Sequence, residues 1–186
     1  YEFFKKKRIE KKQFITGRRA QKYFKNFNDS AHIYKFNDKV ETYKIFNQYF
    51  GRECIYIKNY SFEELKMFCN KHYVFIVKPC YVRFGKGIEK VVVNQQSDLK
   101  ELYSRLIVKD VVLEEYIVQH HEMSAFHPES VNTVRVNSVL TDDGVEIMSA
   151  AFRIGNSGTV VDNHGAGGIV AAVDIDSGKV MTTGVD

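Results

Sequence analysis

Cysteine is scarce in this chain of 186 residues, which contains Cys54, Cys69 and Cys80 and no CxxC pair. Three separated cysteines do not form a disulfide framework or a zinc knuckle, so we expect reduced thiols in a cytoplasmic protein. No run of about 18 apolar residues occurs, so no membrane-spanning helix is expected. No leader with a cleavage site precedes the basic start, so secretion is not indicated.

The composition is that of a folded protein. Hydrophobic residues make up 44% of the chain and aromatic residues 13%, which is too apolar for intrinsic disorder. The length suffices for one hydrophobic core or for two small lobes that share a cleft.

Positive charge is concentrated at the start of the chain. The net charge is +4, but residues 1–25 contain ten basic and two acidic side chains, so this segment carries +8 and the remainder −4. We expect a basic helical segment over residues 1–36. A solvated helix is the favoured interpretation, packed on the body through its apolar side chains, which are Phe3, Phe4, Ile9, Phe14, Tyr23 and Phe24.

Two anionic partners are conceivable for this basic segment. A weak contact of residues 1–25 with an anionic membrane surface stays open. Aromatic residues are sparse among residues 5–12, which argues against specific nucleic-acid binding through base stacking.

The apolar pattern predicts helices mainly in the first half of the chain and strands mainly in the second. Ser61 and Glu64 form a capping-box pattern, Ser97 is expected to cap a further helix, and Asp142-Asp143-Gly144 predicts a hairpin turn. The predicted helices cover residues 37–50, 61–71 and a segment from 97; the predicted strands cover residues 54–58, 73–78, 88–93, 111–118, 131–140, 145–154, 169–175 and 179–183.

This order of elements predicts an α+β fold with two lobes and an antiparallel sheet in each. We assign residues 37–110 to the first lobe and residues 111–186 to the second.

The first group of chemically informative residues surrounds a glycine-rich loop. Lys78 ends a buried strand, and Gly85-Lys86-Gly87 leads into the next strand. Glycines let backbone N–H groups approach phosphate oxygens, and lysine neutralises their charge. The loop joins two strands, so it is not a P-loop, and a plain hairpin turn is the alternative.

The second group is a pair of carboxylates, Glu114 and Glu115, inside an otherwise apolar strand. One interpretation is an edge strand with its acidic residues outward. The other is a linker between lobes, in which the backbone at Glu115 and Ile117 faces an adenine edge.

The third and fourth groups are two arginine runs on neighbouring strands. Arg135 ends the run SVNTVR at residues 130–135, and Arg153 lies in the run FRIG at residues 152–155. A loop with Asn163 and the pair Gly167-Gly168 follows at residues 163–168. Arginines on one face of a sheet are costly unless an anion or a carboxylate receives them, so the runs indicate an anion site or structural ion pairs.

Taken in order, these motifs resemble the ATP-grasp superfamily, and most closely its sugar-transfer-associated branch. The Asn-x-x-x-Gly-Gly spacing is also similar to that of the glutamate-adding ATP-grasp ligases. The resemblance covers about residues 38–186 and implies an ATP-grasp-like fold, which would be incomplete at the C-terminus.

The resemblance implies a role for each motif residue. Lys78 would meet the α-phosphate of ATP, and Gly85, Lys86 and Gly87 would cover the β- and γ-phosphates. Glu114, Glu115 and Ile117 would form the adenine hinge, and Glu122 would bind the ribose. Arg135 and Arg153 would hold phosphate or a substrate carboxylate, and Asn163 would shape the acyl-phosphate site.

The chemistry implied is an ATP-dependent carboxylate–amine (or thiol) ligation through an acyl phosphate, in the synthesis of cell-surface polysaccharide or peptide precursors. The partners would be ATP, a small carboxylate and an amine. Magnesium would also be needed, with ligands expected beyond residue 186, so this chain alone is expected to be inactive. The alternatives are a nonenzymatic nucleotide-binding module and a basic protein that binds nucleic acid or a membrane surface.

Overall fold

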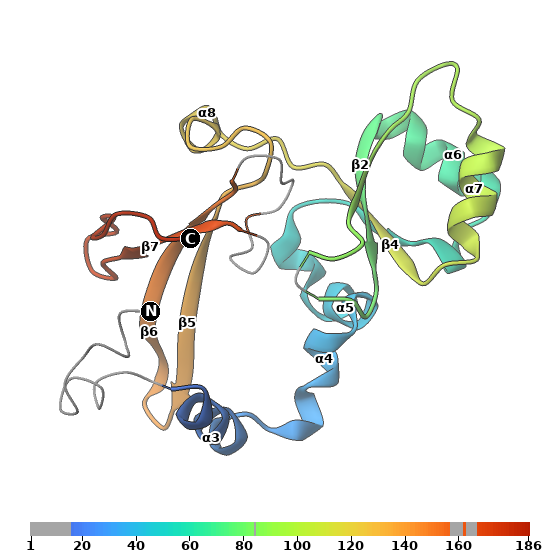
Figure 1. Ribbon diagram of the computed structural model, residues 1–186. Helices are drawn as coiled ribbons and strands as arrows, with labels where there is room; N and C mark the ends of the chain where they lie inside the picture. Colours follow the sequence, from blue (N-terminus) through green and yellow to red (C-terminus); the bar gives the residue numbers. More distant parts are fainter. Residues whose placement is uncertain (1–15, 84, 157–161, 163–166) are drawn as a thin grey trace.

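The computed structural model describes residues 16–83, 85–156, 162 and 167–186, and within them it forms two lobes (Figure 1). The helices are α3 (Gly17–Phe27), α4 (Tyr34–Asn37), α5 (Lys39–Phe50), α6 (Phe62–Lys71), α7 (Leu99–Ile107) and α8 (His121–Ser124), with 3₁₀ turns at Ser30–His32 and Ile57–Asn59. The strands are β1 (Cys54–Tyr56), β2 (Val74–Pro79), β3 (Glu89–Val92), β4 (Val111–Glu115), β5 (Thr133–Thr141), β6 (Gly144–Ile154) and β7 (Ile169–Val173).

The first lobe is built on a four-stranded sheet with the order β1-β4-β2-β3, in which every pair is antiparallel. Helices α6 and α7 lie together on one side of this sheet (Figure 1). The core between them is apolar and includes Leu65 and Phe68 of α6, Leu106 of α7, and Phe75 and Leu113 of the sheet. Because side chains alternate along a strand, Ile76, Lys78 and Glu114 point to the opposite side.

Local capping explains where the helices of the first lobe begin. Asp38 caps α5 by accepting from the Val40 N–H, and Ser61 and Glu64 form the predicted capping box of α6. The cap of α7 is Asp98 rather than the predicted Ser97. Its carboxylate accepts from the backbone N–H groups of two first-turn residues, whereas Ser97 is held in the preceding turn by Asn94.

The second lobe is a three-stranded antiparallel sheet with the order β5-β6-β7. The predicted turn joins β5 to β6, and Gly144 there has φ +123°, a conformation that favours glycine. Phe152 of β6 is buried against Phe126, with the two ring centroids 5.0 Å apart. The two antiparallel sheets and the helices confirm the α+β fold with a sheet in each lobe.

Hydrogen bonds fix the segment that leads into the second sheet. The buried Asn132 amide donates to the backbone oxygens of Met123 (2.7 Å) and His127 (3.1 Å), and its oxygen accepts from the Gly155 N–H (3.1 Å). Gln119 donates to the oxygens of His127 and Ser130. A side chain at position 155 would come within 2.0 Å of the Ser130 hydroxyl, so only glycine fits there.

The predicted limits of two strands need correction. The strand predicted over residues 111–118 ends at Glu115, and it lies between β1 and β2 in the first sheet. The predicted lobe boundary at residue 111 therefore placed this strand in the second lobe, whereas its pairing with β1 and β2 makes it part of the first lobe. The strand predicted over residues 179–183 is reduced to isolated bridges, such as Val173 with Val180.

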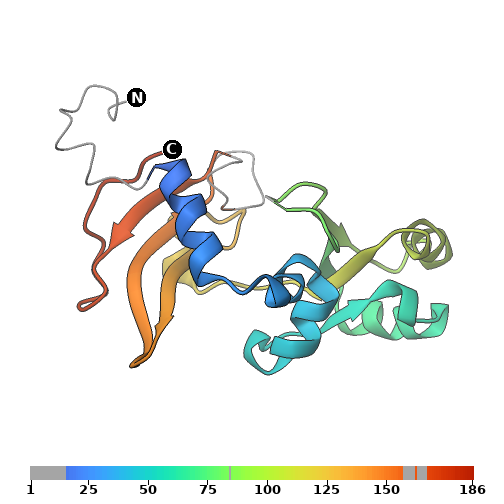
Figure 2. The ribbon, with the colours of Figure 1, turned by 90° about the horizontal axis from the view of Figure 1, so that it is seen from below.

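Helix α3 does not pack on the body of the protein in the way that the favoured interpretation of the basic segment predicted. It lies at the lower edge of the molecule in Figure 1 and crosses in front of the second sheet in Figure 2. Tyr23 is 49% and Phe24 64% exposed, and no described residue of α3 is buried. The expected packing through these two side chains is therefore wrong, since α3 makes only slight contact with either lobe.

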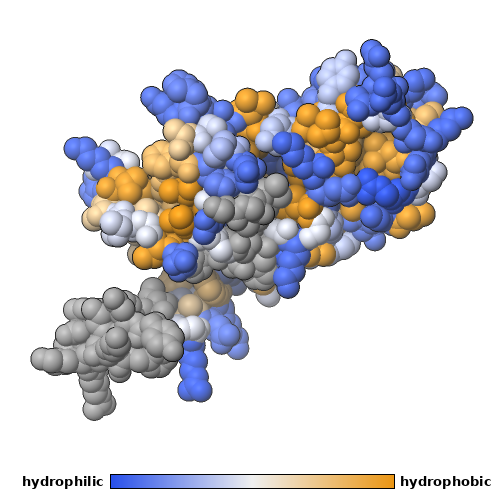
Figure 3. All heavy atoms as spheres, turned by 45° about the horizontal axis from the view of Figure 1, so that its top comes forward, coloured by the Kyte–Doolittle hydropathy of each residue, from blue (hydrophilic) through white to orange (hydrophobic). Residues whose placement is uncertain are grey.

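Apolar side chains are exposed over both lobes on the face shown in Figure 3. In the part of the chain that the structure describes, no helix has the length and apolarity needed to cross a membrane.

Replacing the α7 cap tests the fold locally. Asp98→Ala removes the acceptor of two backbone N–H groups, so we expect a loss of about 1 kcal/mol in the free energy of unfolding. Ser97→Ala is the matched control and should cost less, because Ser97 serves only its own turn. Urea unfolding of both variants measures the difference, and an equal or larger loss for Ser97→Ala would contradict the assignment.

Candidate functional site

A cavity of about 380 Å³ lies where the two lobes meet. Four residues singled out in the sequence line it together: Lys78, Glu114, Glu115 and Ile117. The second lobe contributes Glu129, Val131, Thr133 and Asp162. Its size is within the range of small-ligand sites, and its wall combines apolar and charged side chains.

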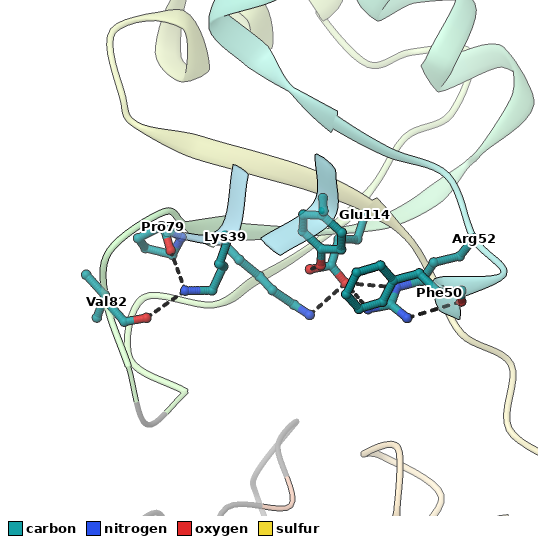
Figure 4. Close-up of polar contacts among 8 residues, drawn as sticks. Lys39, Phe50, Arg52, Pro79, Val82 and Glu114 are labelled. Atoms are coloured by element: carbon teal, nitrogen blue, oxygen red, sulfur yellow. Dashed lines mark hydrogen bonds and ion pairs between the residues drawn. The ribbon is translucent and has the colours of Figure 1, made fainter. Parts of the chain in front are cut away.

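Glu114 is the centre of a buried charge cluster at this cavity (Figure 4). Its carboxylate is 2.7 Å from the Lys78 ammonium and 3.0 Å from the Arg52 guanidinium, and it accepts a hydrogen bond from the Tyr43 hydroxyl. The residue is only 2% exposed. A buried carboxylate is costly unless it is paired, and here two cations and a phenol satisfy it.

The cluster sets the protonation of its members. Burial alone would raise the pKa of Glu114, but Lys78, Tyr43 and Arg52 together hold it below its ordinary value of 4.5. Burial and the Glu114 carboxylate raise the pKa of Tyr43 far above its ordinary value. At neutral pH the cluster therefore contains one carboxylate, two cations and a neutral phenol, with one positive charge in excess.

Lys39 at the start of α5 holds the beginning of the glycine-rich loop. Its ammonium donates to the backbone oxygens of Pro79 (2.8 Å) and Val82 (2.7 Å), as Figure 4 shows. Further along, Gly85 has φ +73° and Gly87 φ +72°, which favour glycine. A side chain at Gly87 would also meet Pro79 at 3.0 Å. Gly85, Lys86 and Gly87 form a turn beside the cavity but are not part of its wall.

The strand β4 passes directly into the link between the lobes. The Glu115 N–H is bonded to the Glu53 oxygen (2.9 Å), and the Glu115 carboxylate accepts from the Glu53 N–H (3.0 Å). Beyond this point, the Ile117 backbone makes no hydrogen bond to any residue that the structure describes. An unpaired strand-like backbone on the wall of a cavity can receive the donor and acceptor groups of a planar ring.

The two arginines of the second sheet share one face. Thr133 pairs with Arg153 across β5 and β6, and Arg135 pairs with Ala151, so both guanidinium groups project to the same side. Arg153 forms an ion pair with Asp162 (3.0 Å), which also accepts from the Thr133 hydroxyl. Arg135 is exposed and has no ion-pair partner among the described residues. This face of the sheet therefore carries one arginine in an ion pair, Arg153, and one exposed arginine, Arg135.

Besides the turn at residues 85–87, the predicted site residues Arg135, Arg153 and Glu122 do not line the cavity. Glu122 is on the short helix α8, 79% of its side chain is exposed, and it does not line the cavity. Asn163 lies outside the described residues. Glu129, seven residues after Glu122, does line the cavity.

The sequence did not single out several residues of the cavity wall. Arg52 follows the C-terminal glycine of α5 and had no motif to mark it, and Lys90 was only one polar position in a strand. The Lys90 ammonium lies 4.3 Å from the centre of the Tyr116 ring. Asp162 precedes the predicted Asn163, and Val131 and Thr133 lie inside the run SVNTVR, so these three had a nearby signal.

The edge-strand interpretation of Glu114 is wrong. β4 lies inside the first sheet, and the carboxylate is buried rather than outward. The Cys80 thiol beside Lys78 is buried, and burial raises its pKa to about 11. A thiol with so high a pKa is a poor nucleophile at neutral pH.

A second cavity of about 430 Å³ lies on the other side of Arg52, between α5 and β1. It is lined by Tyr43, Phe50 and Tyr60 among others, and Arg52 is common to both cavities. None of the residues predicted from the sequence lines it, so the cavity at the junction of the lobes is the better candidate site.

Neutralising Glu114 tests the charge cluster. Glu114→Gln leaves Lys78 and Arg52 close together without a shared anion, so we expect a loss of roughly 3 kcal/mol in the free energy of unfolding at neutral pH. Glu89→Gln is the matched control, because its pair with Arg105 is half exposed and should contribute less than about 1 kcal/mol. Urea unfolding compares the two variants.

The same cluster predicts a pH dependence. A carboxylate with a lowered pKa in the folded state stabilises the fold above its unfolded pKa and loses that effect as the pH falls. The unmodified protein should therefore lose stability below about pH 4.5. The loss should be smaller in Glu114→Gln; an identical acid profile for both proteins would contradict the assignment.

Comparison with known proteins agrees with this geometry. No curated protein is similar enough in sequence to count as a relative. The family model of the sugar-transfer associated ATP-grasp proteins matches residues 18–186. That match spans the two sheets and the whole cavity wall, and the chain therefore belongs to the sugar-transfer associated ATP-grasp family.

Proposed function

We propose that this chain forms the nucleotide site of a ligase that joins a carboxylate to an amine or a thiol through an acyl phosphate. Membership of the ATP-grasp family supports ATP-dependent ligase-type function. The observation that carries the finer proposal is the cavity between the lobes, where Lys78, Glu114, Glu115 and Ile117 meet. Cell-surface polysaccharide or peptide precursors are the proposed substrates.

The reaction would proceed in two steps. A carboxylate oxygen attacks the γ-phosphorus of ATP, the bond to the β-phosphate oxygen breaks, and ADP leaves. The amine or thiol then attacks the acyl carbon, inorganic phosphate leaves with the bonding electrons, and the nucleophile loses a proton. The first step brings two anions together, so fixed cations must lower the repulsion.

The first lobe would hold the nucleotide. The unpaired backbone at Ile117 suits the edge of adenine, and Ile76 and Ile88 supply apolar walls. Lys78 carries the excess positive charge of the Glu114 cluster toward the phosphates. The backbone N–H groups of the turn at residues 85–87 would cover the terminal phosphates.

The second lobe would supply the cations for the carboxylate. Arg135 is exposed on the face that it shares with Arg153, so it is available to a carboxylate or a phosphoryl group. Arg153 is oriented by Asp162, which fixes its distance from the cavity wall. Asn163 would complete the acyl-phosphate site.

ATP carries magnesium in such a reaction, and the metal would neutralise charge on the phosphates. Among the described residues, no group of three His, Cys, Asp or Glu side chains is arranged to hold a metal ion. No residue is therefore assigned to magnesium, and no step is routed through it.

ATP binding tests the nucleotide site. Lys78→Ala removes a charge-assisted contact worth about 1.5–3 kcal/mol, so we expect the Kd for ATP to rise roughly tenfold or more. Lys44→Ala is the matched control, because that exposed lysine pairs with Glu41 on α5 and does not line the cavity. Calorimetric titration measures both, after urea unfolding has shown that the variants are folded. Equal affinities would contradict the site.

Turnover tests the ligase. In the protein that carries this chain, ADP and phosphate should appear only when a carboxylate and an amine or thiol are both supplied. Arg135→Ala should lower kcat roughly a hundredfold, and Arg105→Ala, a surface arginine paired with Glu89, should not. Tight ATP binding with no ADP release under any such combination would favour the nonenzymatic module instead.

A further inference from the structure

Helix α3 has an aromatic face that nothing described covers. Ala20, Tyr23, Phe24 and Phe27 follow the i, i+3, i+4, i+7 spacing of one helix face. Phe24 is 64% and Phe27 66% exposed, so these rings are not part of a core. An exposed aromatic stripe of this kind is typical of a surface that binds a protein, a membrane or a ligand.

The aromatic face continues onto α4 across a groove of about 640 Å³. Phe24 and Phe27 line it from α3, and Ile33 and Phe36 line it from the next segment. Phe36 is 67% exposed, although its ring stacks on Phe46 of α5. The apolar surface is therefore continuous across two helices rather than a set of isolated side chains.

The other side of α3 is cationic. Arg18, Lys22 and Lys25 lie at i, i+4, i+7 opposite the aromatic face, and Arg19 lies beside it. The helix contains no acidic residue. The one carboxylate at the rim of the groove, Asp29, lies 3.8 Å from His32. Aromatic and cationic side chains are thus separated on a helix that packs on neither sheet.

We propose that α3 and the groove toward α4 dock the protein on an anionic lipid bilayer. A helix lying in the interface can bury its aromatic face among the acyl chains while the long lysine and arginine side chains of its polar face bend back toward the phosphate headgroups. The bilayer is the occupant that meets both faces at once, and its negative surface potential attracts each cation by about 1 kcal/mol.

Two other occupants fit the surface less well. A second copy that docked through the same face would present the same cations and no opposite charge. Single-stranded RNA needs aromatic rings and cations side by side, because each base stacks while its phosphate is neutralised, and here they lie on opposite faces.

The docking surface ends at the loop that precedes the nucleotide site. Arg83 lines the groove and donates a hydrogen bond to the Asn37 side chain, and the same loop leads to Gly85. Lys39 fixes the start of this loop to α5. Docking would therefore hold the cavity close to the bilayer, where a lipid-linked substrate would be presented. The docking inference itself does not depend on the ligase proposal.

Vesicle co-sedimentation of the full chain tests the proposal. We expect binding to vesicles of phosphatidylcholine with phosphatidylglycerol, weak binding to phosphatidylcholine alone, and weakening with added salt. Phe24→Ser combined with Phe27→Ser should reduce binding roughly tenfold or more. Tyr49→Ser is the matched control, since that side chain is 76% exposed on α5 outside the groove, and it should bind as the unmodified protein does.

Charge-reversal variants test whether vesicle binding depends on the cationic face of α3 or on the overall charge of the protein. Lys22→Glu should weaken binding roughly fivefold or more, and Lys100→Glu on α7 should change it much less. Both aromatic positions are more than half exposed, so the variants should unfold in urea as the unmodified protein does.

Three results would overturn the proposal. The first is an absence of binding to anionic vesicles. The second is a control variant, Tyr49→Ser or Lys100→Glu, that loses as much binding as the α3 variants do. That result would mean that overall charge or nonspecific hydrophobic adsorption is responsible. The third is a dimer, or a complex with single-stranded RNA, that Phe24→Ser with Phe27→Ser disperses while vesicle binding is unchanged.

Discussion

A carboxylate buried inside a sheet is the constraint on which the first lobe depends. Glu114 lies in β4 between β1 and β2 and is almost fully removed from water. Such a charge is tolerated only when cations and hydrogen-bond donors surround it. Lys78 from β2, Arg52 from the turn after α5, and Tyr43 from α5 meet that requirement. One residue therefore ties the sheet to the helix that covers its other face.

This arrangement links stability to the candidate site. Replacing a buried ion group by apolar residues is often neutral or stabilising, so the cluster is not explained by stability alone. Two cations around one carboxylate leave a positive charge beside a cavity between the lobes. The Tyr43 hydroxyl stays neutral, since burial and Glu114 raise its pKa, so it satisfies the carboxylate without adding charge. The whole wall has three cations and four carboxylates, so binding of an anionic ligand such as a nucleotide would depend on the placement of Lys78 and Arg52 and not on the net charge of the cavity.

The sequence predicted elements whose signals are local, and it failed where pairing over long distances decides. The capping box at Ser61 and the turn before Gly144 are set by neighbouring residues, and both appear as expected. Asp98 in place of Ser97 shows that adjacent capping residues cannot be separated by type alone. The pairing of β1 with β4 joins Cys54 to Glu114, 60 positions apart, and Arg52 contacts Glu114 across 62 positions. No local pattern reports either.

The motifs that indicated the family contain two kinds of residue. Some hold the backbone in place, and others line the cavity or project from the arginine-bearing face of the second sheet. Asn132 and Gln119 bond the segment after β4 to itself, and Gly155 leaves room for the Ser130 hydroxyl. These contacts fix where β5 and β6 begin and end relative to the link between lobes. Since the arginines project from those two strands, their distance from Lys78 depends on that framework. Side chains with no chemical role in the proposed reaction thus help to place the cations that it needs.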